Sequence, residues 1–248
     1  MKIVDAHSHL GYDEVFDVDF PEHELIESQE QNGIDITLVQ PPTVHDLAGV
    51  QRCHDAVADL ARRYPGRFYG IACPNPHLPG DEYETEVRRC VKELGFVGIK
   101  LHPFGHATNP SGTHGRRVFE VAEKLGVPVM VHTGAGIPWS APSLIRPAAE
   151  AHPNLKIVVA HAGHMILSGE ATQLAEACLN VYLEPSWVGG FAIRNWVRRF
   201  GANRVMLGSD HADNTATELA KYRSIGLTED ELSWTLGGTA AAAFGIRD

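Results

Sequence analysis

A short apolar run rich in β-branched residues recurs eight times along the chain, and it constrains the fold more than any other feature. Polar residues follow each run, and most runs lead into a stretch with apolar residues near helical spacing. The runs begin at Ile3, Asp35, Arg67, Phe96, Val127, Lys156, Asn180 and Asn203, at spacings of 23 to 32 residues. Each spacing can hold one strand and one helix, so the pattern predicts a parallel sheet with helices between its strands.

Eight such units in 248 residues predict an α/β fold, a (β/α)8 TIM barrel. The alternative is an open, doubly wound sheet, which usually has a glycine-rich phosphate loop after its first strand, whereas here that strand ends in His-Ser-His. Gly33, Gly95 and Gly126 stand where predicted helices would end. The sequence has no linker, so we expect a single domain over residues 1–248, closed by one or two helices between Thr228 and Ile246.

The charge balance limits the partners of the protein. With 21 Lys and Arg against 31 Asp and Glu, the net charge is −10, which argues against nucleic acid as a partner because binding its phosphates needs a basic face.

Four scattered cysteines without a Cys-x-x-Cys pair predict reduced thiols and a cytoplasmic location. The start of the chain does not resemble a signal peptide, and no apolar run reaches the ~20 residues of a membrane span. We therefore expect a small-molecule substrate and no membrane partner, and leave a homo-oligomer open.

Histidines gather where the predicted strands end, which is the face on which barrels build active sites. His7 and His9 are two apart in the first strand, so both rings should point into the barrel mouth, where two imidazole nitrogens can bind one divalent cation. Asp5 shares their parity and could orient one of the rings.

His132, His161 and Asp210 end the fifth, sixth and eighth runs. Each alone could serve only the structure, because a strand-end Asp often caps a helix and a strand-end His can bind a loop. Ligand-type residues at four strand ends together predict a metal site.

The segments DAHSHLG, GIKLHP, VHTG, AHAGH and GSDH, with the closing LGGTAAAAFGI, resemble the amidohydrolase superfamily over essentially the whole chain. They look most like its amidohydrolase-related branch, which includes carboxymuconate-semialdehyde decarboxylase-like enzymes and several lactonases. The resemblance implies a metal-dependent TIM barrel with His-x-His on strand one, His on strands five and six, and Asp on strand eight.

The resemblance also implies two alternatives for the cofactor, which we expect to be zinc or a similar divalent metal. In the one-metal pattern, which we favour, His7, His9, His132 and Asp210 hold one ion, and His161 is an acid/base outside its shell. In the two-metal pattern, His161 and a carbamylated Lys100 join the ligands. Lys100 could instead pair with a substrate carboxylate or a carboxylate of the barrel.

Further residues near the strand ends are candidates for substrate contact, namely His102, Trp187 and Glu184. For Glu184, a structural role such as capping or an ion pair is an equal alternative. For Trp187, simple packing is the alternative.

A bound metal that lowers the pKa of water suits hydrolysis, with Asp210 as general base and His161 as a catalytic residue that stabilises an oxyanion or carries a second proton. We therefore expect a metal-dependent hydrolase of a small amide, lactone or ester. The same residues would serve the first alternative, a nonoxidative decarboxylase of a small carboxylic acid. Two alternatives without catalysis are a metal-binding barrel and a scaffold with ordinary histidines.

Overall fold

The protein is described here by a computed structural model of residues 2–246, whose strands form a parallel sheet. Met1, Arg247 and Asp248, the ends of the predicted domain, lie outside the described residues. The sheet has seven strands in the order β1-β4-β5-β6-β7-β8-β9. They are β1 (Val4–His9), β4 (Ile36–Gln40), β5 (Phe68–Ala72), β6 (Gly98–Leu101), β7 (Val129–His132), β8 (Ile157–Ala160) and β9 (Val181–Glu184).

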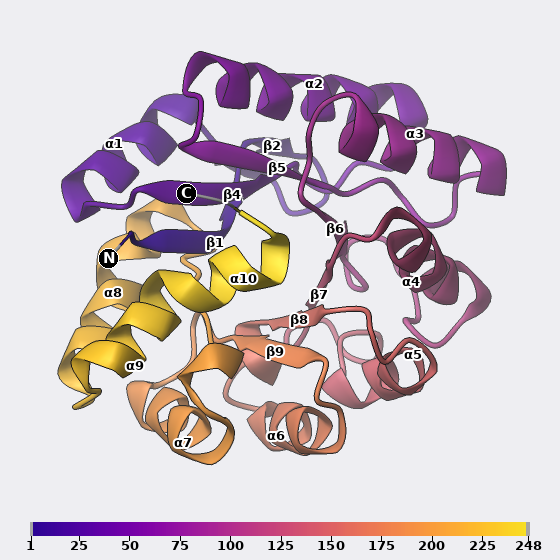
Figure 1. The fold of residues 1–248 in the computed structure, drawn as a ribbon. Coiled ribbons are helices and arrows are strands. Elements are labelled where there is room, and N and C mark those ends of the chain that lie inside the picture. Colours follow the sequence, from indigo (N-terminus) through magenta and orange to yellow (C-terminus); the bar gives the residue numbers. More distant parts are fainter. Residues whose placement is uncertain (1, 247–248) are drawn as a thin grey trace.

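Helices surround the curled sheet, as Figure 1 shows. They are α1 (Glu22–Asn32), α2 (Leu47–Arg63), α3 (Gly80–Lys92), α4 (Thr113–Leu125), α5 (Arg146–Ala151), α6 (Ser168–Ala177), α7 (Gly190–Phe200), α8 (Thr215–Ser224), α9 (Glu229–Ser233) and α10 (Thr239–Phe244). Gly33 and Gly126 end α1 and α4 in the left-handed conformation that glycine adopts easily, as predicted. Among residues 2–246, no helix is long and apolar enough to cross a membrane.

The predicted closing helices cover one end of the strands. Buried apolar residues on the inner side of the sheet, such as Ala6 and Met130, form one cluster with Ala243 and Phe244 of α10. The ring of Phe244 lies where a side chain at Gly98 would point. The closing helices thus lie at the N-terminal ends of the strands, opposite the C-terminal ends at which barrels build their active sites.

The eighth predicted strand does not form, which corrects the strand count. The segment 205–210 makes a single bridge, between Val205 and Leu183. It nevertheless bonds both edge strands, because Met206 N–H donates to Leu183 O (2.9 Å) and Ala6 N–H donates to Leu207 O (3.0 Å). The strand pattern breaks because Leu207 N–H donates instead to Thr235 O (2.8 Å), in the π-helical segment Trp234–Gly238 that precedes α10.

A small hairpin that the sequence pattern did not predict follows β1. It consists of β2 (Gly11–Asp13) and β3 (Val18–Phe20), paired antiparallel. The buried Asp13 carboxylate holds the turn, because its Oδ1 accepts from the backbone N–H of Val15 (2.9 Å) and of Phe16 (3.1 Å). The hairpin brings Phe16 and Phe20 to the C-terminal ends of the strands, where both line a cavity.

Candidate functional site

A cavity of about 250 Å³ lies at the C-terminal ends of the strands. Six of its lining residues are histidines, namely His7, His9, His102, His132, His161 and His211, and Lys100 and Asp210 also line it. The predicted gathering of histidines on this face is therefore present in the structure.

A bulge in β1 decides which side chains enter this cavity. The register against β4 shifts between Asp5 and Ser8, so the alternation of the strand breaks there. His7 and His9 face the cavity, whereas Asp5 accepts from Ser209 Oγ (2.6 Å) and from Gln29 of α1. Asp5 thus holds the segment 205–210 to β1. It does not orient a histidine ring, which is the role that its position two residues before His7 had suggested.

Three ligand-type atoms converge in the cavity. His7 Nε2 lies 3.1 Å and His9 Nε2 3.3 Å from Asp210 Oδ1, and the two Nε2 atoms are 3.3 Å apart. Ligands about 2.1 Å from one ion are separated by about 3.0 Å in octahedral and about 3.4 Å in tetrahedral geometry. These residues therefore fit a divalent cation.

Glu184 at the end of β9 lies behind His7 and does not line the cavity. His7 Nδ1 donates to Glu184 Oε2 at 2.6 Å, so Nε2 faces the cavity with its lone pair. Burial, followed by the charge of Lys100, holds the pKa of His7 well below its usual range, which keeps the ring in the neutral form that binds metals. Burial also raises the pKa of Glu184 to about 7. The pair has the arrangement of a metal-binding histidine oriented by a carboxylate.

Glu184→Gln is expected to weaken divalent-metal binding about tenfold to a hundredfold, the usual effect of changing a residue that orients a metal-bound histidine. The amide can still accept from His7 Nδ1, but it removes the negative charge that makes the ring a stronger ligand. Isothermal titration with Mn²⁺ measures the change.

A second buried histidine–glutamate pair supplies the matched control. His54 Nδ1 donates to Glu86 Oε1 at 2.6 Å, between α2 and α3, and Cys90 lies beside them. His54 Nε2 accepts from the backbone N–H of Cys73, and Glu86 also accepts from Arg89, so this cluster is satisfied without an ion. Glu86→Gln should leave Mn²⁺ affinity unchanged, and equal losses in both variants would show a general effect of destabilisation.

His132 at the end of β7 and His161 directly after β8 both line the cavity, but they have different neighbours there. His132 Nε2 bonds to Ala135 O (2.9 Å), and its ring stacks on that of His102 with centroids 4.3 Å apart. His161, not His132, joins His7 and Asp210 in a group whose ligand atoms lie within 4.8 Å of one another. His161 Nδ1 bonds to Ser186 Oγ (2.8 Å), and burial lowers the pKa of His161.

Lys100 provides a buried amine inside the cavity. It is 2% exposed, its Nζ lies 3.0 Å from His7 Nε2, and burial lowers its pKa to about 8. Among residues 2–246, no carboxylate oxygen lies within 4.0 Å of Nζ, although the charges of Asp210 and Glu184 act on it from farther away. His102 lines the same cavity, and its Nδ1 accepts from the N–H of Gly105 (2.9 Å).

Two aromatic rings form the roof of the cavity. Phe16 of the hairpin and Phe104 of the loop after β6 have ring centroids 5.4 Å apart. Gly136 lies against this roof with a φ of 89°, and a Cβ there would stand 2.1 Å from Phe104 Cγ. The sequence analysis did not identify the aromatic residues of this cavity, because they do not follow directly from any predicted strand. They are Phe16, Phe20 and Phe104.

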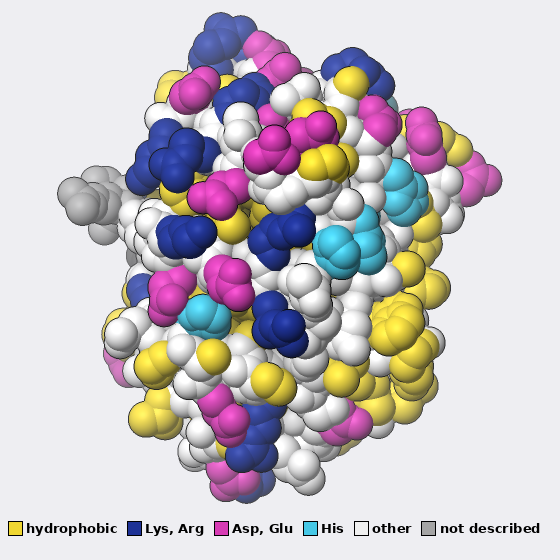
Figure 2. Space-filling model, turned by 90° about the vertical axis from the view of Figure 1, so that its right-hand side faces the viewer, with side chains coloured by type: hydrophobic (Ala, Val, Ile, Leu, Met, Phe, Trp, Pro, Cys, Tyr) yellow, Lys and Arg dark blue, Asp and Glu magenta, His cyan; other side chains and the backbone are white. Residues whose placement is uncertain are grey.

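Large exposed apolar side chains lie in the loops around this cavity, including Phe104, Ile137, Trp139, Met165 and Ile166. Figure 2 shows apolar side chains along its right-hand edge, on the side away from α10. Two further histidines, His77 and His114, have ring centroids 4.6 Å apart and do not line the cavity.

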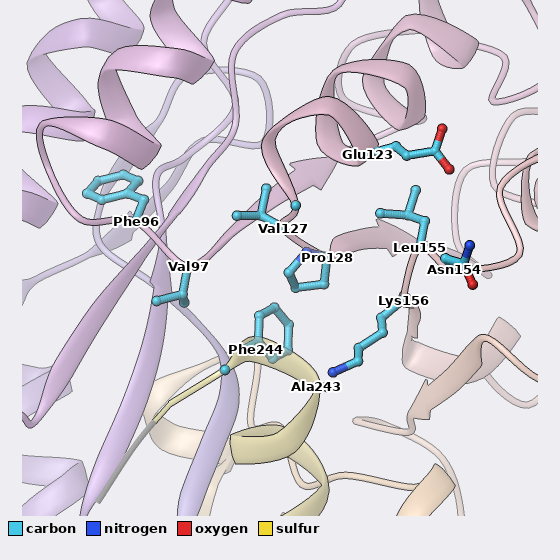
Figure 3. A pocket seen from close by; sticks show the side chains of 12 residues that line it. Phe96, Val97, Glu123, Val127, Pro128, Asn154, Leu155, Lys156, Ala243 and Phe244 are labelled. Atoms are coloured by element: carbon cyan, nitrogen blue, oxygen red, sulfur yellow. The ribbon is translucent and has the colours of Figure 1, made fainter.

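A larger cavity of about 530 Å³ lies at the other end of the strands, beside α10 (Figure 3). Pro128, Leu155 and Phe244 line it, and Lys156 donates from its rim to Ala242 O (2.6 Å). Among the described residues, no group of side chains that could bind a metal lines it. The candidate metal ligands lie in the cavity at the C-terminal ends of the strands.

Comparison with known proteins gives one family match and several relatives. The family model described as Amidohydrolase matches residues 4–246. A 2-keto-4-carboxy-3-hexenedioate hydratase from a Sphingobium species is 29% identical over 126 residues, which are 42% of this chain and 35% of that protein. A gamma-resorcylate decarboxylase from Rhodococcus jostii is 28% identical over 150 residues, which are 47% of this chain and 45% of that protein. The matches thus span less than half the length of these curated relatives.

A solved structure shares the fold over nearly the whole chain. A 5-carboxyvanillate decarboxylase from Novosphingobium aromaticivorans, complexed with manganese and 4-hydroxy-3-methoxy-5-nitrobenzoic acid, has a TM-score of 0.81 and 17% identity. The match covers 99% of this chain and 96% of that one.

These relatives contradict the expected hydrolase. They are named for decarboxylation and hydration, so the prediction of amide, lactone or ester hydrolysis was wrong. The error arose because metal-ligand residues at strand ends serve all of these reactions alike.

Proposed function

Because this chain belongs to the amidohydrolase family, which matches residues 4–246, we propose that it is a metal-dependent decarboxylase that acts nonoxidatively on a small carboxylic acid. The observation that carries the proposal is Lys100, a buried amine in the cavity that has no carboxylate oxygen within 4.0 Å among residues 2–246, so that only the more distant charges of Asp210 and Glu184 act on it. A buried cation is costly unless an anion pairs with it, and a substrate carboxylate would be that anion.

The metal site is the second part of the proposal. His7, His9 and Asp210 would hold a divalent cation, manganese or zinc, with His161 beside it. When bound, the ion supplies a Lewis acid that polarises an oxygen of the substrate.

The residues of the chain then account for binding and proton transfer. Lys100 binds the carboxylate that is lost, and the Phe16–Phe104 roof excludes water from it. The bond between the carboxylate and its neighbouring carbon breaks, CO₂ leaves, and the electron pair stays on that carbon. In its imidazolium form, in which Nδ1 donates to Ser186 Oγ and the extra proton has come from solvent, His161 delivers the Nε2 proton to that carbon and returns to the neutral imidazole.

The finer features of the fold belong to the same proposal. We infer one barrel domain in which the segment 205–210 takes the place of the eighth strand. Support comes from its hydrogen bonds to both β9 and β1 and from the family match over residues 4–246. The cytoplasmic location and a homo-oligomer stay predictions.

The test is CO₂ release from a panel of hydroxybenzoates and unsaturated keto acids by protein loaded with Mn²⁺ or Zn²⁺. Release of CO₂ from at least one acid, lost on chelation, is expected. Hydration is the second candidate, favoured by the relative named as a hydratase, and it would change substrate absorbance and mass by one water without CO₂. Fully loaded protein that releases no CO₂ from any acid would reject the decarboxylase.

A further inference from the structure

Trp187 lies in the loop between β9 and α7, beside the cavity but not among its lining residues. Its side chain is 44% exposed. A contact with the substrate was the sequence-based prediction, and the geometry instead directs the indole at Asp210.

The indole and the proposed metal site share one carboxylate. Trp187 Nε1 donates to Asp210 Oδ2 at 2.8 Å. The other oxygen, Oδ1, is the atom near His7 Nε2 and His9 Nε2. Each oxygen of Asp210 thus has its own direction, one toward the two histidines and one toward the indole.

The loop holds Trp187 firmly in this position. Its backbone N–H donates to Glu218 Oε1 at 2.8 Å, and that buried carboxylate also accepts from Asn214 (3.0 Å) and Lys221 (2.7 Å). Trp187 has a φ of 67°, a left-handed conformation that costs a bulky residue about 1–3 kcal/mol and persists only where the surroundings enforce it. The ring also meets His211 edge-on, with centroids 5.6 Å apart.

The partner residue is held in an equally unusual way. Asp210 also has a φ of 67°, and its backbone N–H donates to His7 O at 2.7 Å. The main chain therefore fixes the backbone position of Asp210, but rotation about the Cβ–Cγ bond would exchange the two carboxylate oxygens. The indole N–H distinguishes them at the shortest distance, 2.8 Å from Oδ2, and His211 Nε2 lies 3.5 Å from the same oxygen.

We propose that Trp187 is a positioning residue that keeps Asp210 a one-oxygen ligand of the divalent cation, which rests on the metal site of the proposed function. By occupying Oδ2, the indole prevents the carboxylate from binding the ion through both oxygens. A coordination position then stays open for a substrate oxygen.

The test compares Trp187→Phe with Trp139→Phe as Co²⁺ complexes. Trp139 is also a partly exposed loop tryptophan, after β7, and its indole donates no hydrogen bond within residues 2–246. Trp187→Phe is expected to weaken Co²⁺ binding about tenfold. Its visible Co²⁺ absorption should also fall, as it does when the coordination number of Co²⁺ rises. Trp139→Phe should match the parent in both measurements.

A second variant separates the hydrogen bond from the packing of the ring. Incorporating 3-benzothienylalanine at position 187 keeps the two fused rings and removes only the N–H donor, so it should reproduce the weaker, less absorbing Co²⁺ complex. An unchanged spectrum and affinity in this variant would overturn the positioning role while leaving the metal site intact. Failure of the parent itself to bind one Co²⁺ per chain would instead overturn the metal site, and the role of Trp187 with it.

Discussion

Replacing His7 and His9 together by alanine is expected to remove stoichiometric divalent metal and to leave the protein folded. The double variant deletes two of the three atoms that converge within 3.3 Å of one another. Binding should weaken by more than the ~100-fold upper effect of a residue that only orients a ligand. The fold should survive because Glu184 keeps its bonds from Ser186, and because the apolar cluster capped by α10 is untouched.

Metal content after Mn²⁺ loading and desalting, measured by mass spectrometry, tests this expectation, with circular dichroism to follow the fold. The matched control replaces His77 and His114, a histidine pair outside the cavity, and it should retain one ion per chain. One tightly bound ion in the His7/His9 variant would show that the metal lies elsewhere or is absent from this site.

Replacing Lys100 by methionine is expected to lower kcat/KM for a carboxylate substrate about 30- to 5,000-fold, because truncating one partner of a buried charge pair costs about 2–5 kcal/mol. Methionine has a similar length and removes a buried charge, so the variant should be at least as stable as the parent. Metal content should stay at one ion per chain, because Lys100 is not among the three convergent ligands.

Steady-state CO₂ release at saturating Mn²⁺ measures this effect, with the exposed Lys92→Met as control. A Lys100→Met protein that keeps its metal and the full kcat/KM would remove Lys100 from substrate binding. The carboxylate would then need another anchor in the cavity.

The sequence predicted most of the sheet because its strands are buried on both faces and appear as continuous apolar runs. The run that begins at Asn203 shows where this reasoning fails. It is as apolar as the others, but Leu207 bonds to the π-helical segment before α10 and Ser209 to Asp5, contacts that no local pattern reveals.

The candidate site was partly predictable for a similar reason. His7, His9 and Asp210 follow apolar runs directly, and the C-terminal ends of parallel strands meet at one edge. The roles of Glu184 and Trp187 depend on which atom of a neighbour each one faces. Those choices follow from the bulge after Asp5 and from the conformation of the loop after β9.

The roof over the cavity has a consequence for how related sequences can vary. Phe104 can lie against Phe16 only because residue 136 has no side chain, since a Cβ there would overlap the Phe104 ring. Positions 104 and 136 should therefore vary together among related sequences. Homologues with a larger residue at 136 should carry a smaller one at 104, and the paired exchange would widen the entrance for bulkier substrates.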